Sequence, residues 1–375
     1  MIERRSFLLS GAALSLLSAC GGADRFADGG SVATVDPGLR PQRNAGYDAW
    51  VAAFRGRAAA KGLREDVIAR AFRNAGFLPG VVERDRNQTE FKRSFEDYLS
   101  LVANEDKVLQ GRAAYARERR VLDAVEAKYG VASQIVCAIW GVESNFGARM
   151  GDIPVISALS TLAYDGRRGA FFEGQLIAAL KILQAGDVSP ERMTGSWAGA
   201  MGHTQFIPTS YLAFAVDFTG DGRRDIWGAN PADGLASTAA YLSRNGWARG
   251  GGWSREDPSG TMQPDPGGPR FSVSGNFRVI KRYNNSDSYA LAVGYLADRI
   301  AGGGPLRQKF GPDRYGLTQP QRKRLQELLN RAGFDVGKPD GVLGPKSRAA
   351  IEAYQREAGL PVTGNPSPAL LARLG

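Results

Sequence analysis

Apolar residues recur three and four positions apart along most of the chain, which is the spacing of amphipathic helices. The segments YDAWVAAFRGRAAAKGL and REDVIARAFRNA show this spacing, and Gly62 and Gly76 lie at their expected ends. It continues in ERDRNQTEFKRSFEDYLSLV and in RRVLDAVEAKYG, where Gly130 is expected just beyond the last turn. Alternation typical of strands occurs in FSVSGNFRVIKRYN, residues 271–284, which we predict as a hairpin. The expected fold class is mainly α with a small β element.

Composition divides the chain into a main domain and a smaller C-terminal unit. The stretch after the N-terminal segment is rich in Gly, Asp and Pro and indicates a flexible tether, and AGGGP further on indicates a linker. Beyond the linker, QRKRLQELLNRAGF and PKSRAAIEAYQREAGL predict helices with a core of their own. The predicted divisions are a signal peptide at 1–20, a tether at 21–44, a main domain at 45–301, a linker at 302–314 and a C-terminal domain at 315–375.

The N-terminal segment has the features of an export signal. Arg4 and Arg5 precede an apolar run, FLLSGAALSLL, that is too short to span a membrane as a mature helix. The run ends in LSAC, which resembles a bacterial lipobox, so we expect lipidation of Cys20; plain secretion with an incidental cysteine is the alternative. Gly21 favours the outer membrane, while RRSFLL leaves Sec and twin-arginine export open. We expect a periplasmic, outer-membrane lipoprotein in which Cys137 has no disulfide partner.

The chain is basic, with a formal net charge of +10. Residues 306–375 hold 12 Lys and Arg against 6 Asp and Glu, so 12 − 6 = +6 of that charge lies in the C-terminal unit. A basic surface favours an anionic partner. Nucleic acid is one candidate, but an exported lipoprotein seldom meets it, whereas cell-wall polymers carry lactyl and peptide carboxylates. We therefore interpret the C-terminal unit as a module that targets the cell wall, and we expect no nucleic-acid partner.

The run IVCAIWGVESNFG brings a carboxylate to the end of an almost entirely apolar helix. At 100° per residue, Glu143 lies on the same helix face as the core-type residues Val136 and Ile139. Burial and the C-terminal end of the helix dipole both disfavour the charged form, so we expect a raised pKa for Glu143. A carboxylic acid that keeps its proton near neutral pH is suited to general acid catalysis. A structural glutamate held by a buried arginine or by N–H groups is an equal alternative.

The stretch GSWAGAMGHTQFIPTSY is a glycine-rich loop with one side-chain amide, Gln205. Small residues and an amide suit a polysaccharide groove, where sugar hydroxyls need neutral partners. A tight turn packed against the core is the alternative. His203, the only histidine of the chain, lies in this loop and is interpreted as a wall residue. A single histidine excludes a His-rich zinc site.

A third polar cluster precedes the apolar segment SYALAVGYLADRI. Asn284, Ser286 and Tyr289 lie together at the expected start of that helix. Ser286 or Asp287 is a suitable N-cap, which accounts for part of the cluster without any functional role.

An acidic loop, DFTGDGRRDIW, follows the glycine-rich loop. Asp217, Thr219 and Asp221 occupy positions 1, 3 and 5 of an EF-hand-like loop. Position 12 holds a glycine instead of the usual glutamate, so Asp225 or Asp233 would have to close the site. Carboxylate and hydroxyl oxygens suit a hard cation in a structural role, and a plain Asx-turn without metal is the alternative.

Taken together, the motifs resemble the lytic murein transglycosylases of the B type. WGVESNFG, GSWAGAMGHTQFIPTSY, DFTGDGRRDIW and RYNNSDSYA match that family's motifs in order, and YDGRRGAFF and FEDYL also fit. The likeness covers most of residues 45–300. DGVLGPKSRAAIEAYQREAGLPVTG looks like the common peptidoglycan-binding domain of three helices. The resemblance implies a lysozyme-like catalytic core with an additional helical region and a small β element, followed by that domain.

The resemblance also implies roles for individual residues. Glu143 would be the catalytic acid and base, while Ser196 and Asn284 would hold the N-acetyl group of the muramoyl sugar or stabilise the reacting carbohydrate. The side chains implied to line the glycan groove are Tyr98, Arg167, Arg168, Gln205, Tyr241, Tyr283 and Tyr289. The implied ligands of a structural Ca²⁺ or Na⁺ are Asp217, Thr219, Asp221, the carbonyl of Arg223 and Asp233. No cofactor is implied for the chemistry.

The implied reaction uses one carboxyl group where ordinary glycosidases use two. The glutamic acid protonates the bond between MurNAc and GlcNAc, and the resulting carboxylate then deprotonates the MurNAc 6-hydroxyl, which closes a 1,6-anhydro ring. A hydrolysing muramidase is the alternative enzyme, with Glu173 or Asp165 as its second carboxylate. A non-catalytic anchor between membrane and peptidoglycan is the alternative outside the enzymes.

Overall fold

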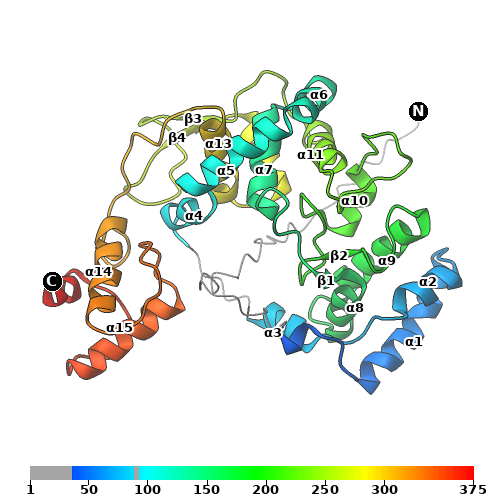
Figure 1. The fold of residues 1–375 in the computed structure, drawn as a ribbon, viewed down its shortest axis with the longest axis horizontal. Helices are drawn as coiled ribbons and strands as arrows, with labels where there is room; N and C mark the ends of the chain where they lie inside the picture. The colour runs from blue at the N-terminus through cyan, green and yellow to red at the C-terminus, as the bar shows by residue number, and fades with distance from the viewer. Residues whose placement is uncertain (1–35, 88–92) are drawn as a thin grey trace, which may run out of the picture.

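The computed structural model describes residues 36–87 and 93–375, and these form three helical bodies (Figure 1). They contain sixteen α-helices and two antiparallel sheets of two short strands each. The expected fold class, mainly α with a small β element, is confirmed. The predicted signal peptide and lipidated Cys20, with most of the predicted tether, lie outside the described residues.

Helix α7 (Ser133–Ser144) lies at the centre of the first core, in the upper part of Figure 1. All its residues from Ile135 to Ser144 are buried, because α5, α6, α11 and α13 pack around it. A helix that is apolar on nearly every face is expected to be enclosed in this way. The elements of this core are α4 (Phe95–Val102), α5 (Glu105–Arg117), α6 (Arg119–Tyr129), α7, β3 (Ser254–Glu256), β4 (Phe271–Val273), α11 (Ala232–Arg244), α12 (Gly275–Tyr283) and α13 (Asp287–Ile300).

A second core lies at the lower right of Figure 1 and is built around the paired helices α8 and α9. Its elements are the 3₁₀-helix η1 (Pro37–Leu39), α1 (Ala45–Ala60), α2 (Glu65–Phe72), α3 (Pro79–Arg86), β1 (Ile153–Pro154), α8 (Val155–Asp165), α9 (Gly169–Ala185), β2 (Thr194–Gly195) and α10 (Pro208–Phe214). The chain enters this core for the second time after α7 and returns to the first core with α11. Tyr241 and Tyr283 pack against both cores and therefore mark their junction.

The prediction of a hairpin at 271–284 is wrong. Only Phe271–Val273 forms a strand, which pairs antiparallel with Ser254–Glu256, far back in the sequence. Ser274 then caps a helix by accepting a hydrogen bond from the backbone N–H of Asn276, so the rest of the segment is α12. The alternation extends over too few residues to specify a second strand, and the cap begins a helix before the pattern can continue.

Most of the helix ends predicted from the sequence agree with the structure. Gly130 follows α6 in the left-handed region, with a φ of 72°, and Gly62 follows α1 with a φ of 83°. Ser286 is the N-cap of α13 and accepts a hydrogen bond from the backbone N–H of Tyr289. Gly76 instead lies beyond the end of α2 at Phe72 and allows a close approach to Pro41.

The C-terminal unit is a separate bundle of three helices, at the lower left of Figure 1. Its helices are α14 (Gln319–Arg331), α15 (Pro345–Glu357) and α16 (Pro368–Leu374). Their core contains Leu317, Leu325, Leu329, Val336, Ala350, Ile351 and Leu370. The three-helix prediction for this unit is therefore confirmed.

One arginine of α14 joins this unit to the first core. Arg322 is only 1% exposed, and its Nη2 donates to Glu96 Oε2 at 2.9 Å and to Asp97 Oδ1 at 2.7 Å, both on α4. Its Nη1 donates to Asp313 Oδ2 at 3.0 Å. Burial raises the pKa of both Glu96 and Asp97 despite this arginine. Arg322 is thus the shared counter-charge of a desolvated acidic cluster at the contact between the two bodies.

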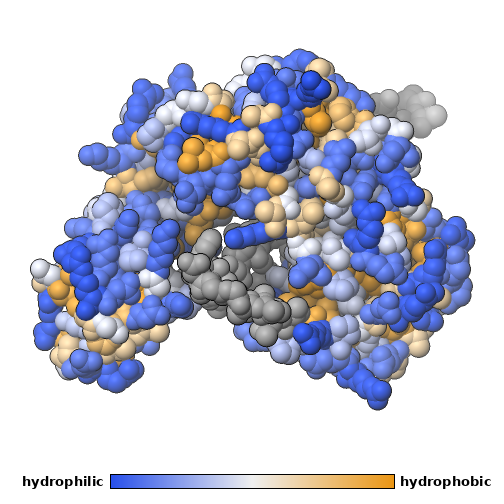
Figure 2. Space-filling view, in the orientation of Figure 1, coloured by the Kyte–Doolittle hydropathy of each residue, from blue (hydrophilic) through white to orange (hydrophobic). Residues whose placement is uncertain are grey.

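Figure 2 shows a mostly hydrophilic face with apolar residues in separate groups. The helices in the described part of the chain are all too short or too polar to cross a membrane.

We expect Arg322→Met to detach the C-terminal unit from α4. The substitution leaves three carboxylates without their buried counter-charge, a change that typically costs about 3–5 kcal/mol. Limited proteolysis between α13 and α14, followed by mass spectrometry, measures the detachment as faster cleavage. The matched control is Arg324→Met, since the side chain of Arg324 is 46% exposed and pairs with Glu327 on the same helix. Equal cleavage rates in the two variants would contradict the role given to Arg322.

Candidate active site

Glu143 lies in the last turn of α7 and is only 8% exposed. The hydroxyl of Tyr289 donates a hydrogen bond to its Oε1 at 2.6 Å. Tyr289 belongs to the first turn of α13, which the Ser286 cap holds in place. The expectation that Glu143 lies on the buried face of its helix is therefore confirmed. Its expected pKa shift stays a prediction.

The described residues contain three buried carboxylates, and each has a different environment. Asp85 is held by the guanidinium groups of Arg167 and Arg168. Asp233 accepts three backbone N–H groups. Glu143 instead receives the phenol of Tyr289, a weak acid. The hydrogen bond from Tyr289 is thus a contact that neither of the other two buried carboxylates makes.

Tyrosines surround the carboxyl of Glu143. Burial, with the charge of Glu143 as the next cause, raises the pKa of Tyr283 and Tyr289 well above the ordinary value. An electrostatic contribution from Tyr98, on α4, raises the pKa of Tyr289 further. These phenols consequently stay protonated at neutral pH, and the hydroxyl of Tyr289 remains a hydrogen-bond donor.

Tyr241 and Tyr283 extend this group to the junction of the two cores. Their ring centroids are 5.0 Å apart, and both rings contact Phe206 at the end of the glycine-rich loop. The Tyr241 hydroxyl donates to the carbonyl of Arg282 at 2.6 Å, and that of Tyr283 to the carbonyl of Thr204 at 2.7 Å. The glycine-rich loop is therefore held against the helices that follow it in sequence.

Backbone strain is concentrated at the same place. In the described residues, the only non-glycine residues with positive φ are Asn145, Phe146 and Gln205, at 54°, 56° and 53°. Two of them follow directly after α7, and the third lies in the glycine-rich loop. Asparagine tolerates this region, but the other two types rarely adopt it. Such residues persist where surrounding packing fixes them, and they cluster at functional sites.

The glycines of the loop make close contacts with protein atoms. A Cβ on Gly195 would lie 2.2 Å from the carbonyl oxygen of Ala200, and one on Gly202 would lie 2.2 Å from that of Ile226. The density of glycine is thus explained by a tight turn, as the alternative for this loop proposed. Within that turn, the Ser196 hydroxyl accepts a hydrogen bond from the N–H of Ala200.

Gln205 is fixed in orientation by two carbonyls. Its side-chain nitrogen donates to Met150 at 2.9 Å and to Gly202 at 3.0 Å. Two carbonyl acceptors require the NH₂ group on that side, which assigns the amide orientation. The side-chain oxygen therefore points to the opposite side as an acceptor.

The structure gives Arg167 and Arg168 a partner that the sequence motif does not indicate. Both guanidinium groups contact Asp85 of α3, which is 1% exposed, and the side chain of Arg168 is itself only 18% exposed. The pair therefore joins α3 to the start of α9 in the second core. Their implied role in the glycan groove stays a prediction.

Lys107 was missed by sequence reasoning. Its ammonium donates to the carbonyl of Gly141 at 3.1 Å and contacts the side chain of Asn145. A cation at this helix end counteracts the dipole that was expected to disfavour charge on Glu143. Since Lys107 lies on α5, no local pattern could have indicated the contact.

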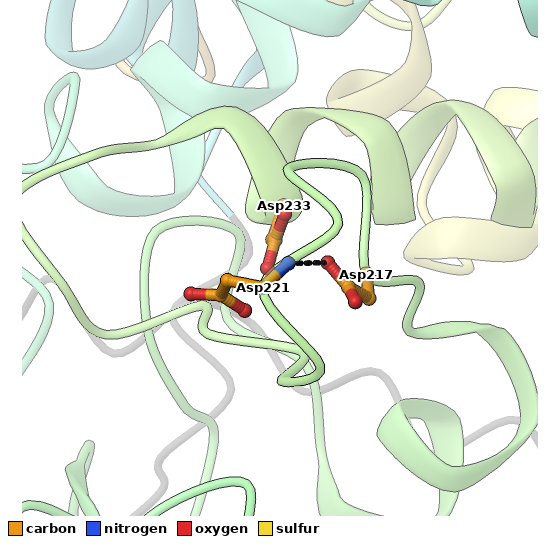
Figure 3. Close-up of side chains that lie close together, drawn as sticks. All are labelled: Asp217, Asp221 and Asp233. Carbon is orange, nitrogen blue, oxygen red and sulfur yellow. Dashed lines mark hydrogen bonds between the residues drawn. The ribbon is translucent and has the colours of Figure 1, made fainter.

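The acidic loop brings three carboxylates together, as Figure 3 shows. One oxygen each from Asp217, Asp221 and Asp233 lies within 4.8 Å of the others. Asp225 instead accepts the N–H of Trp227 and pairs with Arg192, so Asp233 is the residue that closes the loop.

The donor set of this loop fits a hard cation. Thr219 adds a hydroxyl 3.4 Å from Asp217 Oδ1. Burial, opposed by three N–H groups and assisted by the charge of Asp217, raises the pKa of Asp233. Crowded oxygens of this kind are the ligands that calcium prefers.

The comparisons identify the class of protein. The chain belongs to the transglycosylase SLT domain family, whose profile matches residues 46–262 and 254–298. A peptidoglycan binding domain family matches residues 318–374. The lysozyme-like character expected of the core is consistent with this membership.

Two relatives of known structure cover most of the chain. SltB3 from Pseudomonas aeruginosa, solved in complex with NAG-anhNAM-pentapeptide, is 44% identical with a TM-score of 0.68, over 88% of this chain and 100% of that chain. The Escherichia coli lytic transglycosylase Slt35, solved in complex with calcium, is 26% identical with a TM-score of 0.58, over 69% of this chain and 93% of that chain.

A curated relative is the membrane-bound lytic murein transglycosylase B of Escherichia coli strain K12. It is 31% identical over an alignment of 234 residues, and the match covers 52% of this chain and 64% of that protein. The match therefore spans less than two thirds of that relative's length.

Proposed function

We propose that this protein is a lytic murein transglycosylase that cleaves the β-1,4 bond between N-acetylmuramic acid and N-acetylglucosamine without water. The observation that carries the proposal is the buried carboxyl of Glu143 beside the hydroxyl of Tyr289, at the junction of two cores. The similarity to SltB3, which was solved with a peptidoglycan fragment containing an anhydro sugar, supports the same reaction.

The first step is protonation of the leaving oxygen. Glu143 gives its proton to the glycosidic oxygen, the C1–O bond of the muramoyl sugar breaks, and an oxocarbenium-like or oxazolinium species forms with the acetamido group. The hydroxyl of Tyr289 occupies Oε1. The Tyr289 hydrogen bond strengthens as the carboxylate appears.

The second step returns the proton to Glu143. The carboxylate removes the proton of the muramoyl 6-hydroxyl, and that oxygen bonds to C1, which gives the 1,6-anhydro ring and restores the acid. In this scheme Ser196, Asn284 and the side-chain oxygen of Gln205 hold the sugar through neutral groups, with Tyr98, Tyr241 and Tyr283 as aromatic walls. Positioning of this kind compensates for the absence of a second carboxylate.

A hydrolysing muramidase would need a second carboxylate beside Glu143. The two candidates from the sequence are both held by arginines on elements of the second core. Glu173 makes a two-point contact with Arg57, at 3.0 and 2.9 Å, and Asp165 accepts from Arg86 at 2.6 Å. These contacts favour the transglycosylase over the muramidase.

We further propose that the C-terminal unit binds peptidoglycan and that Cys20 carries a lipid anchor to the outer membrane. The charge of +6 on residues 306–375 supports an anionic wall polymer as ligand. The name of the Escherichia coli relative as membrane-bound supports the location.

We expect Glu143→Gln to lower kcat on sacculi by roughly 10²–10⁴-fold, because an amide cannot exchange the proton. Mass spectrometry of released muropeptides, with digestion in ¹⁸O-labelled water, measures both rate and chemistry. The parent should release anhydro ends without ¹⁸O. Labelled reducing ends would support the muramidase, and undiminished release by the variant would remove Glu143 from the mechanism. Retained binding of the variant to sacculi is the control.

Tyr289→Phe should lower kcat with a smaller effect than loss of Glu143. A hydrogen bond to a charged group contributes about 1.5–3 kcal/mol, which is roughly a 10- to 100-fold change in rate. The matched control is Tyr295→Phe on the same helix, whose hydroxyl contacts Arg299 instead. Equal rates for the two variants would show that the Tyr289 hydroxyl does not assist Glu143.

We also propose that the acidic loop binds Ca²⁺ in a structural role, with Asp217, Thr219, Asp221, the Arg223 carbonyl and Asp233 as ligands. Calcium at 100 times its Kd should stabilise the fold by about 2.7 kcal/mol, and chelation should reverse the rise in Tm. Asp217→Asn should abolish the calcium response, and Asp335→Asn, in the C-terminal unit, should leave it intact. An equal rise in Tm with Na⁺ alone would assign the loop to sodium.

A further inference from the structure

His203 has a more defined environment than a wall residue needs. Its ring is buried, with 4% of the residue exposed, and lies at 72° to the ring of Trp140. The indole N–H of Trp140 donates to Nδ1 at 3.1 Å, so Nδ1 carries no proton. Nε2 therefore carries the proton and donates to the carbonyl of Gly228 at 2.8 Å. Burial also lowers the pKa of His203, which keeps the ring neutral.

The backbone of His203 contacts the same two segments as its ring. Its N–H donates to the carbonyl of Ile226 at 2.9 Å. Its carbonyl accepts from the hydroxyl of Ser144 at 2.6 Å, and Ser144 is the residue after Glu143. That hydroxyl also accepts the N–H of Gly147 at 3.0 Å. His203 thus makes two hydrogen bonds to the end of α7 and two to residues 226–228.

Residues 226 and 227 end the acidic loop, and Gly228 follows it directly. The N–H of Asp225 donates to Asp233 Oδ2, and Asp225 in turn accepts the N–H of Gly228. On the other side, a Cβ on Gly234 would lie 3.1 Å from the Cβ of His203, so the residue after Asp233 packs directly on the histidine. A continuous series of short contacts therefore joins the three carboxylates to the strained turn after Glu143.

We infer that His203 is a positioning residue that couples the acidic loop to the catalytic end of α7, so that the order of the loop determines the position of Glu143. The inference rests on the proposed function for its effect on catalysis, but the coupling itself is independent of it. The position requires one hydrogen-bond acceptor and one donor, and the neutral imidazole provides both, because it accepts from Trp140 and donates to Gly228.

Three variants separate coupling from simple packing. His203→Phe keeps an aromatic ring against Trp140 but removes both side-chain hydrogen bonds. His203→Gln keeps one acceptor and one donor. Asp217→Asn loosens the acidic loop whether or not a cation is bound, because Asp217 accepts the N–H groups of Gly220, Asp221 and Gly222.

The first measurement is amide hydrogen exchange in peptides covering residues 140–149. Asp217→Asn should increase exchange there in the parent background and should have no further effect in the His203→Phe background. His203→Phe alone should increase exchange at 140–149 and at 226–228 together. An equal effect of Asp217→Asn in both backgrounds, or no effect in the parent, overturns the inference. If His203→Phe does not fold, Trp140→Phe, which removes one hydrogen bond, replaces it in the same cycle.

The second measurement is kinetic. His203→Phe should lower kcat roughly 10- to 100-fold with little change in KM, as expected when a catalytic group is misplaced. His203→Gln should restore most of the rate. A parent that couples the segments in exchange but releases no anhydro muropeptides would refute the proposed function and leave the coupling intact. The single histidine also gives one pair of imidazole signals in ¹⁵N NMR, which must show the neutral Nε2–H form; the opposite tautomer contradicts the assignment.

Discussion

In the proposed function, Glu143 is buried at the edge of a core and still exchanges a proton, and much of the surrounding structure fits that constraint. A carboxyl in such a position needs a hydrogen-bond partner that does not fix its charge. The phenol of Tyr289 provides one, from a residue 146 positions later in the chain. The first core must therefore close around α7 with α13 in place before the site exists.

The same constraint explains why the strain lies where it does. Directly after Glu143 the chain leaves one core for the other, and it turns through Asn145 and Phe146 in the left-handed region. Lys107 contacts the side chain of Asn145, and the Ser144 hydroxyl bonds to both His203 and Gly147, so several contacts hold this turn. Strain of about 1–3 kcal/mol per residue persists only where several contacts fix it. The packing that buries α7 therefore also fixes the strained turn that follows it.

Local spacing accounts for what the sequence predicted well. The helical face of Glu143, the cap at Ser286 and the convergence of Asp217 with Asp221 all depend on residues a few positions apart. The contact of Asp85 with Arg167 and Arg168, 82 and 83 residues later, depends on tertiary packing, which no local pattern contains. The failed hairpin at 271–284 has the same cause, because the strand partner of Phe271 lies at Glu256.

The C-terminal unit is joined to the site through a shared element. Helix α4 carries Glu96 and Asp97, which pair with Arg322. The next residue of this helix is Tyr98, which helps to raise the pKa of Tyr289. Burying one guanidinium among three carboxylates contributes little net stability, but it favours the observed docking geometry, since a displacement leaves charges desolvated and unpaired. Arg322 therefore acts mainly on orientation. The same short helix therefore contacts the C-terminal unit and carries one of the tyrosines near Glu143, which in the proposed function relates the bound wall polymer to the site.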